Sequence, residues 1–417
     1  MNRRKNVWIV AVVALVVLAA VAALSACGGT STTDSSASPG TGETKTLTIG
    51  VLMPFSGDGA LWGRTELAST EVAADHVNAA GGIKVGNDTY KLAVKAYDNQ
   101  WDPAVSATVA RKAVADGIRY ILSWSGPEVL AENAATRGTT VLTFVTASDE
   151  ICQGPKHPNN YNDWFYFPDN MTVLYTYIHD TYPEDKTVAM IVTDDAVSIK
   201  EAEDLKKYIE PIGFDVMDPV KISGDETDFY PVLTPLIKSG VDVIDLASPS
   251  PEDASLIIKQ ARELGYKGRF AHADAPNIDD YAAVAGWDAV EGFVGAPVYT
   301  DLTDVGKAWQ KDYMAKTNND TSTGPTADYD AMLLLAAAIE KAGTVDPDAV
   351  NAALPTVTVQ GTTGETRYGG ADVMGIPHLL ERPINVVEVQ NGKIVSVYSG
   401  WPPRITATMS SSPSPAE

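Results

Sequence analysis

His272 and Asp274 come closest, by type and spacing, to a pair of metal ligands in this sequence, and Asp279 and Asp280 follow shortly after them. Metal sites built wholly from protein usually supply more nitrogen or sulfur ligands than this segment offers. Matches as loose as this one arise often by chance. We therefore predict that the protein holds no metal ion.

Motifs that would carry out catalysis are mostly absent from the sequence. G-x-S-x-G, H-E-x-x-H, the Walker loop and C-x-x-C do not occur in it. Gly57-Asp58-Gly59 is followed by Gly63, one residue too far along for the glycine-rich loop that binds dinucleotides, so a strand-to-helix turn is the simpler interpretation. We predict a protein that is not an enzyme, with no catalytic residue and no cofactor.

Cys27 stands at the end of an apolar run, Val7 to Leu24, that begins behind three basic residues at positions 3–5 and closes with Leu24-Ser25-Ala26. A basic front and a small-residue end are typical of a cleaved secretory signal. The junction resembles the lipobox of bacterial lipoproteins, which implies that residues 1–26 are removed and that Cys27 carries the lipid that anchors the protein to the membrane. The alternative is an uncleaved N-terminal anchor helix. Both place the remaining chain on the extracytoplasmic side, in the periplasm or on the outer face.

Acidic residues dominate the charge of the chain, with 54 Asp and Glu against 31 Lys and Arg and a net charge of −23. Loss of the signal removes three basic residues and brings the net charge to −26. Nucleic acid and anionic lipid surfaces repel such a chain, so we predict no nucleic-acid partner. Cys152 is the other cysteine, and since no motif surrounds it we expect it to serve packing.

From Leu47 onward, short β-branched runs alternate with longer amphipathic stretches, which is the pattern of β-α-β units and a mainly parallel sheet. Asp102 and Pro103 predict the start of a helix that Gly117 closes, and Gly81-Gly82 and Gly265 are expected to end two others. The expected strands form one series at 47–53, 92–97, 120–123 and 141–145 and a second at 188–193, 216–222, 241–246 and 269–272. Later segments are expected to be helical at 304–316 and 325–342 and extended at 384–389 and 394–398.

Two successive series, joined by an irregular aromatic stretch at 152–170, predict an α/β fold with two doubly wound Rossmann-like lobes, a hinge and a central ligand cleft. In such sheets the ligand sits at the carboxyl ends of the strands. The predicted divisions are a signal at 1–26, a flexible tether at 27–46, a first lobe at 47–168 and about 298–375, a second lobe at 169–297 and about 376–402, and a disordered tail at 403–417.

Several blocks of sequence occur in the order and at the spacing seen in one family. They are LTIGVLMPFSGDGALWG from residue 47, HVNAAGGIK from 76, KLAVKAYDNQWDPAVSATVARKAVADGIRYIL from 91, IIKQARELGYKGRFAHAD from 257 and ADYDAMLLLAAAIEKAG from 327. They resemble the periplasmic binding proteins for leucine, isoleucine and valine. The resemblance implies a lipoprotein with the type I periplasmic binding protein fold, which closes on an amino acid or a related small polar or amide ligand and delivers it to the permease and ATPase subunits of an ABC importer. The alternative is a ligand-sensing receptor module with the same two lobes, whose closed conformation is recognised by a signalling partner.

The resemblance also implies ligand-binding residues in the first lobe. The family binds the ligand carboxylate where a helix begins after the third strand, which assigns Ser125 and Gly126 to this role, and a helix start favours an anion. The loop after the fourth strand contributes Thr146, Ala147 and Ser148. Trp62 matches a tryptophan that lines the family's pocket, although an aromatic residue of this kind can equally belong to the core.

In the second lobe, the resemblance places Asp274 where an acid reaches the α-ammonium of an amino acid, and the alternative is that Asp274 caps the next helix. The sequence departs from the family at three other places. Ser198 and Pro249-Ser250 stand where tyrosines usually close over the ligand, and Trp101 stands where one cysteine of a disulfide would be. We therefore expect Ser198 to contribute to a smaller, more polar closing face, with room for a bulkier or more hydrophilic ligand than leucine.

Overall fold

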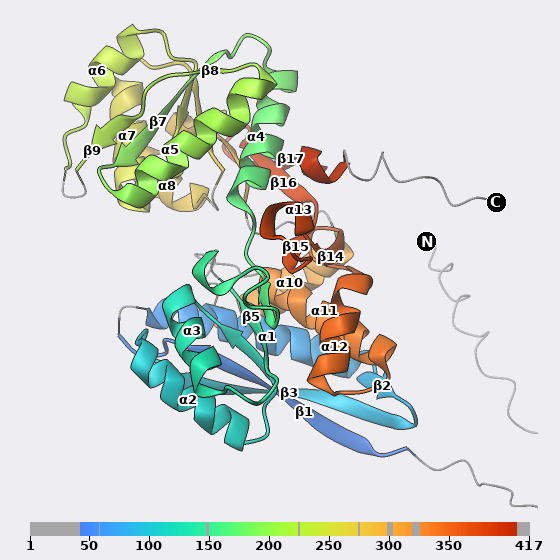
Figure 1. Ribbon diagram of the computed structural model, residues 1–417. Coiled ribbons are helices and arrows are strands. Elements are labelled where there is room, and N and C mark those ends of the chain that lie inside the picture. Colours follow the sequence, from blue (N-terminus) through green and yellow to red (C-terminus); the bar gives the residue numbers. More distant parts are fainter. Residues whose placement is uncertain are drawn as a thin grey trace, which may run out of the picture. The chain divides into compact units, whose positions relative to one another are not determined.

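The computed structural model describes residues 42–406 apart from residue 58 and residues 147–149, 224–225, 274–275, 298–302 and 319–325 (Figure 1). Helices and strands alternate along most of this length. The helices are α1 Ala60–Ala79, α2 Pro103–Ala115, α3 Gly126–Ala135, α4 Phe167–Thr181, α5 Ala196–Ile209, α6 Tyr230–Lys238, α7 Pro251–Glu263, α8 Ile278–Ala285, α9 Trp287–Val290, α10 Asp304–Thr317, α11 Thr326–Ala342, α12 Pro347–Ala353 and α13 Ala371–Met374. Three 3-10 turns lie at Glu150–Cys152, Glu210–Ile212 and Leu354–Thr356.

The first of two sheets has the strand order β13-β14-β15-β6-β5-β4-β1-β3-β2. Its central strands run parallel, while β2, β13 and β14 pair antiparallel at the two edges. The strands are β1 Thr44–Met53, β2 Ile83–Val85, β3 Asp88–Asp98, β4 Tyr120–Ser123, β5 Leu142–Val145, β6 Asn160–Asn162, β13 Thr358–Gln360, β14 Glu365–Gly369 and β15 Leu379–Glu381. We call this sheet and the helices packed on it the first lobe.

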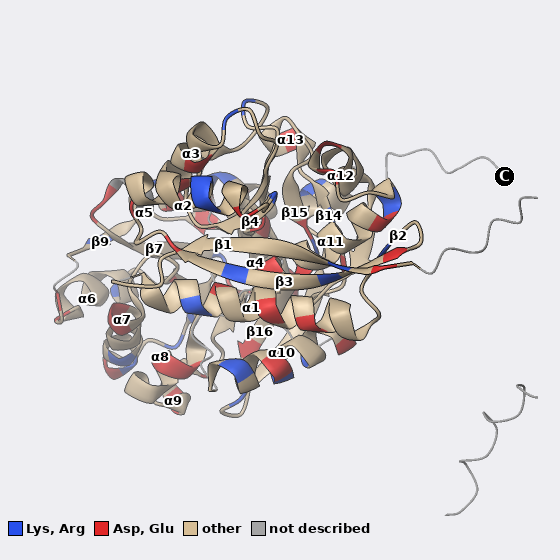
Figure 2. Cartoon of the chain, turned by 90° about the horizontal axis from the view of Figure 1, so that it is seen from below, with Lys and Arg blue, Asp and Glu red and all other residues tan. Residues whose placement is uncertain are grey.

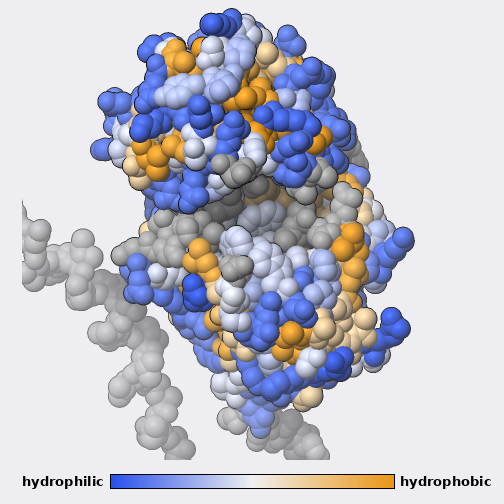
Figure 3. All heavy atoms as spheres, turned by 90° about the vertical axis from the view of Figure 1, so that its left-hand side faces the viewer, coloured by the Kyte–Doolittle hydropathy of each residue, from blue (hydrophilic) through white to orange (hydrophobic). Residues whose placement is uncertain are grey.

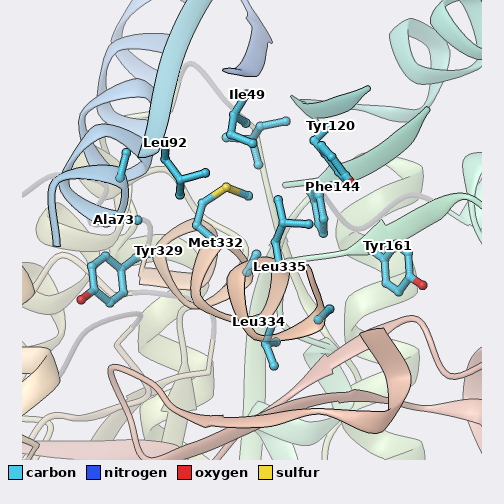
Figure 4. Packing of buried hydrophobic residues seen from close by; sticks show 14 of the residues in the cluster. Ile49, Ala73, Leu92, Tyr120, Phe144, Tyr161, Tyr329, Met332, Leu334 and Leu335 are labelled. Atoms are coloured by element: carbon cyan, nitrogen blue, oxygen red, sulfur yellow. The ribbon is translucent and has the colours of Figure 1, made fainter. Parts of the chain in front are cut away.

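Both faces of the first sheet are covered. Alternate residues of β1 point to opposite faces, so Ile49 packs in the cluster that contains α1, α10 and α11, whereas Leu52 packs with α2. In Figure 4, Met332 and Leu335 of α11 lie among residues of the sheet such as Ile49 and Phe144. The main core of this lobe therefore depends on a helix that comes about 280 residues after β1 in the chain.

The second sheet has the strand order β17-β16-β12-β11-β10-β7-β8, with β9 also paired to β7. Its strands are parallel except at β16 and β17, which are antiparallel to their neighbours. They are β7 Thr187–Thr193, β8 Asp215–Val216, β9 Val220–Ile222, β10 Val243–Asp245, β11 Arg269–His272, β12 Val294–Gly295, β16 Ile384–Val389 and β17 Ile394–Gly400. Here too β7 alternates, with Ile191 packed beside α6 and α7 and Met190 beside α4 and α5. This sheet and its helices form the second lobe.

The α/β fold class with two doubly wound lobes is confirmed, and so are most of the predicted elements. β4, β11 and β16 have the predicted bounds. The side chain of Asp102 accepts hydrogen bonds from the backbone N–H groups of Ala104 and Val105, and Gly117 and Gly265 have the left-handed backbone expected beyond a helix end, with φ of +89° and +87°.

Some predicted bounds are wrong. The strand expected at 216–222 is two short strands, because Pro219 has no N–H to continue the ladder. β15 pairs with β6 and β14 of the first sheet, so residues up to Glu381 belong there and not to the second lobe from 376. Residues 44–46, predicted to belong to the flexible tether, pair with β3. Residues 403–406, predicted to belong to the disordered tail, form a helical turn in which Arg404 bonds Asp169.

Charged and apolar residues are spread over the surface. Figure 2 shows acidic and basic residues interspersed on both strands and helices. On the face drawn in Figure 3, hydrophilic residues cover most of the surface, and hydrophobic residues form small groups between them. No helix in the described part of the chain is long and apolar enough to cross a membrane. The apolar run at 7–24 and Cys27 lie outside the described residues.

Candidate functional site

The turn from β4 into α3 places two serines beside two buried glutamates. The Ser125 hydroxyl donates a hydrogen bond to the carboxylate of Glu128, and Ser123 Oγ donates to Glu132 Oε1 over 3.0 Å. Glu128 and Glu132 lie one turn apart on α3 and are only 3% and 2% exposed. Ser125 stands at the N-cap position of α3 but makes no side-chain bond to a backbone N–H of the helix, because its hydroxyl is directed to Glu128.

This arrangement changes what the start of α3 can bind. Both serine protons are given to carboxyl groups, and Pro127, in the first turn, has no N–H. Burial raises the pKa of Glu132 well above its usual range, although the bond from Ser123 lowers it, and this favours the neutral form of Glu132. Gly126, the first residue of the helix, still presents a backbone N–H at the positive end of its dipole.

Thr146 follows β5 and lies beside the same turn. Its backbone N–H donates to the carbonyl oxygen of Ser123 at 3.0 Å, and its hydroxyl reaches the same oxygen at 3.4 Å. Thr146 is 1% exposed. The structure thus brings Thr146 together with the Ser125–Gly126 turn, whereas Ala147 and Ser148, the other predicted residues of this loop, lie outside the described residues.

Trp62 belongs to a group of three tryptophans. Its ring stacks on that of Trp124 with the ring centroids 5.7 Å apart, and Trp101 meets both rings edge-on, at 5.4 Å from Trp62 and 6.5 Å from Trp124. Trp62 comes from the first turn of α1, Trp101 from the turn between β3 and α2, and Trp124 from the turn after β4. The group therefore covers the carboxyl ends of three neighbouring strands, β3, β1 and β4. Sequence reasoning assigned Trp62 alone to the site and missed the other two.

Ser198 lies in the first turn of α5, beside the carboxyl end of β7 in the second lobe. Its hydroxyl is within 2.6 Å of Thr193 Oγ1 and donates to Asp195 Oδ2 over 2.8 Å, while its backbone N–H donates to Asp195 Oδ1 at 3.0 Å. A hollow beside this group is lined by Thr193, Asp194, Asp195, Lys221, Ile222 and Ser223, and Lys221 Nζ pairs with Asp194 at 2.8 Å. Ser198 is 6% exposed, and its polar atoms bond Thr193 and Asp195, which precede α5.

Asp274, two positions after the last residue of β11, lies outside the described residues. The neighbouring His272 is 6% exposed, and its Nδ1 is 2.9 Å from the hydroxyl of Tyr281. No group of three or more His, Cys, Asp or Glu side chains among the described residues is arranged to hold a metal ion.

Arginines connect the segments that pass between the lobes. Arg404 forms two bonds to Asp169, from Nε at 2.8 Å and from Nη2 at 2.7 Å, and a third to Glu381 at 2.9 Å. Arg382 Nη1 bonds Asp330 at 2.9 Å. Beside this network is a cavity of about 30 Å³, bordered by Trp164, Phe165 and Tyr166 among others, which has room for about one water molecule and none for an amino acid.

Comparison with known proteins agrees with this architecture. A family model described as periplasmic binding protein matches residues 46–393. The leucine-, isoleucine-, valine-, threonine- and alanine-binding protein of Pseudomonas aeruginosa is 27% identical over 331 residues, which cover 78% of this chain and 86% of that protein.

Two crystal structures share the fold. A branched-chain amino acid ABC transporter periplasmic ligand-binding protein from Burkholderia xenovorans matches with a TM-score of 0.70 and 21% identity, over 85% of this chain and 96% of the other. The closed conformation of a leucine-, isoleucine-, valine-, threonine- and alanine-binding protein from Brucella ovis matches with a TM-score of 0.71 and 20% identity, over 85% and 95%. The two sheets are thus those of a type I periplasmic binding protein. Because the family model spans most of its length, the chain belongs to the periplasmic binding protein family and is a solute-binding protein rather than an enzyme.

Proposed function

We propose that this protein is the substrate-binding component of an ABC importer, anchored by lipid on Cys27 to the extracytoplasmic side of the cell membrane. It binds an amino acid or a related small polar or amide ligand between its lobes and delivers it to the permease and ATPase subunits. The relatives named for branched-chain amino acids and for an ABC transporter support this class of ligand and partner.

One observation carries the proposal. Trp62, Ser125, Gly126 and Thr146 meet at the carboxyl ends of β1, β4 and β5, which is where a doubly wound sheet binds its ligand. Apolar ring surface and a few fixed polar groups, side by side, are what a small-molecule site needs for affinity and orientation. Ser198 and Asp274 are proposed to complete the site from the second lobe, together with Ala147 and Ser148 in the first.

A thermal-shift screen of the purified protein against L-amino acids, their amides, aromatic acids, polyamines and sugars tests ligand binding. A ligand present at 100 times its dissociation constant stabilises the folded state by about 2.7 kcal/mol, which raises the melting temperature by a readily measured amount. We expect a shift with α-amino acids or their amides. No shift with any compound of the screen would contradict the proposed function, and a shift with sugars alone would remove the amino-acid assignment.

Replacement of Cys27 tests the anchor. In the Cys27→Ala variant we expect the protein to leave the membrane fraction or to remain as an unprocessed precursor, because the acylated thiol is gone. Cys152→Ala is the matched control and should stay in the membrane fraction. Metabolic labelling with a radioactive fatty acid reports lipidation directly, and undiminished labelling of Cys27→Ala would contradict the assignment.

A further inference from the structure

We propose that Trp62, Trp101 and Trp124 form a cation-binding wall in the first lobe and that the ligand carries a positively charged nitrogen that lies against these rings. The inference rests on the proposed function, since it assumes that a small ligand binds at the carboxyl ends of the first sheet. Beyond the proposed function, the inference states that the ligand group bound by the first lobe is positively charged. A carboxylate at this place, which the family resemblance implies, is the opposite expectation.

Three separate elements contribute to the wall, and part of it is left open. Trp101 is 42% exposed although it contacts the rings of Trp62 and Trp124, which are only partly buried themselves. The face of an indole carries negative charge density and attracts a cation, more strongly where water is excluded. Exposed indole surface at the ligand end of the sheet is therefore suited to a positively charged partner.

The backbone holds Trp101 in an uncommon conformation. Gln100 and Trp101 both have left-handed φ, at 56° and 54°, which few residues other than glycine adopt. The two side chains that precede the turn hold it, because Asp98 Oδ1 accepts from the N–H of Gln100 at 3.0 Å and Asn99 Oδ1 accepts from that of Trp101 at 3.1 Å. Such backbone strain is concentrated at functional sites.

Gly59 gives the indole of Trp101 the room to reach its neighbours. A Cβ atom at position 59 would lie 2.9 Å from the Trp101 ring and 2.7 Å from the ring of Pro54. Contacts this short do not occur between real Cβ atoms and their neighbours, so the close packing of this ring requires glycine here. Both the turn that carries Trp101 and the glycine at position 59 therefore fix the position of its ring.

The charged side chains near the three tryptophans indicate whether the ligand group bound there is positive or negative. Among the described residues of 53–64, 97–103 and 122–132, which carry the three tryptophans, the acidic ones are Asp98, Asp102, Glu128 and Glu132, and the basic one is the exposed Arg64. Even with Glu132 neutral, three acidic residues stand against one basic residue in these segments, so their net charge is negative. In addition, the partly buried Ser125 gives its proton to Glu128, so the lone pairs of its hydroxyl oxygen are left to accept from an N–H group of the ligand. Both features favour an ammonium or a similar cation.

A pair of probes with the same shape and different charge tests the proposal. The purified protein is titrated with choline and with 3,3-dimethyl-1-butanol, in which carbon replaces the charged nitrogen, while tryptophan fluorescence is recorded. L-Leucine and benzoate are titrated in parallel as a zwitterion and an anion. We expect choline to bind with a dissociation constant at least about tenfold lower than that of the neutral alcohol, and benzoate to bind more weakly than either.

Variants then locate the site. Trp101→Leu and Glu128→Gln should each weaken choline binding by about tenfold, whereas Trp287→Leu, which removes a similarly exposed tryptophan on α9 of the second lobe, should leave it unchanged. Trp101 is exposed enough that its replacement leaves the core intact, and circular dichroism spectra of each variant check that it is folded.

The outcomes separate this inference from the proposed function. Equal affinity for choline and the alcohol, tighter binding of benzoate, or choline binding that survives Trp101→Leu overturns the cation wall. If L-leucine binds and choline does not, the proposed function stands and the cation wall fails. If neither these probes nor the amino-acid screen gives binding, the proposed function itself fails.

Discussion

Ser125 and Glu128 show how one pair of side chains changes the interpretation of a site. The sequence and its resemblance to the family predict a serine that donates to a ligand carboxylate, and in the structure this hydroxyl donates to Glu128 instead. A hydroxyl has a single proton, so it cannot serve both carboxylates at once. Binding of a carboxylate here would require Glu128, which is 3% exposed, to lose its donor.

We expect Ser125→Ala to lower the free energy of unfolding by roughly 1 to 3 kcal/mol, because it leaves the buried carboxylate of Glu128 without the hydroxyl. Urea denaturation measured by circular dichroism reports this change. Thr108→Ala, which removes a hydroxyl from the exposed face of α2, is the control and should shift stability by less than about 0.5 kcal/mol. Equal effects of the two substitutions would show that the Ser125–Glu128 bond contributes nothing to stability.

Asp274→Asn tests the proposed contact of this acid with a ligand ammonium. Removal of one member of a buried charged pair should weaken an amino-acid ligand by roughly 2 to 4 kcal/mol in isothermal titration calorimetry. Asp280→Asn, on the exposed first turn of α8, is the matched control and should bind as the natural sequence does. A dissociation constant that Asp274→Asn leaves unchanged would remove Asp274 from the site.

The sequence located part of the candidate site and missed part of it, for identifiable reasons. Family resemblance pointed to Trp62 and to the Ser125–Gly126 turn, and the structure places them close together through Trp124. Trp101 was noted only as a replacement for a cysteine, because nothing in its neighbours along the chain shows that its ring turns toward Trp62. Glu128 looks like an ordinary acid in a first helical turn, and only the fold reveals that it is buried under Ser125.

The start of α2 is determined by residues next to it in the sequence. Asp102 Oδ1 accepts from the N–H groups of Ala104 and Val105 at 2.8 and 2.9 Å, and Pro103 occupies the first turn. We expect Asp102→Ala to destabilise the protein by about 1 kcal/mol, and Asp102→Asn to stay within a few tenths of a kcal/mol of the natural sequence, since Asn caps equally well. Urea unfolding midpoints check both, and equal losses for Ala and Asn would rule out capping as the cause.

Elements with strong local signals were predictable, and elements defined by pairing were not. β4, β11 and β16 are apolar runs bounded by turns, and their predicted bounds are confirmed. β6, β12 and β15 are two or three residues long and were missed, since a piece this short is a strand only because a neighbouring strand pairs with it. β15 also carries Glu381, a buried acid that bonds Arg367 on the neighbouring strand β14 and Arg404 beyond β17.

At the scale of the whole molecule, buried acids connect stability to pH. Asp245 on β10 is fully buried, accepts from the hydroxyl of Tyr175 at 2.7 Å and from the N–H of Ala247 at 2.9 Å, and burial raises its pKa to about 6. The folded protein therefore binds this proton more tightly than the unfolded chain does. The stability that the proton contributes is present below about pH 4 and is lost as the pH rises past 6.

Asp245→Asn should remove this loss, because the amide is neutral at every pH and can donate to Tyr175 while accepting from Ala247. The free energy of unfolding of the variant, relative to the natural sequence, should therefore rise by roughly 2 to 3 kcal/mol between pH 4 and pH 7. Urea unfolding of both proteins at four pH values measures the difference. Asp169, whose pKa burial also raises to about 6, is present in both proteins, so its effect cancels. Parallel stability curves would contradict the assignment.

The order of the strands in the first sheet has a consequence for synthesis and export. β1 is made first, yet its core needs Met332 and Leu335 of α11, and the sheet is complete only when β15 has been made at residue 381. Most of the second lobe, from α4 to β12, lies between these points as one continuous segment. A ribosome therefore releases nearly the entire chain before the first lobe can close its core. The N-terminal part of the newly made chain therefore remains unfolded until late in synthesis. An unfolded chain is the form that a secretion channel can transport.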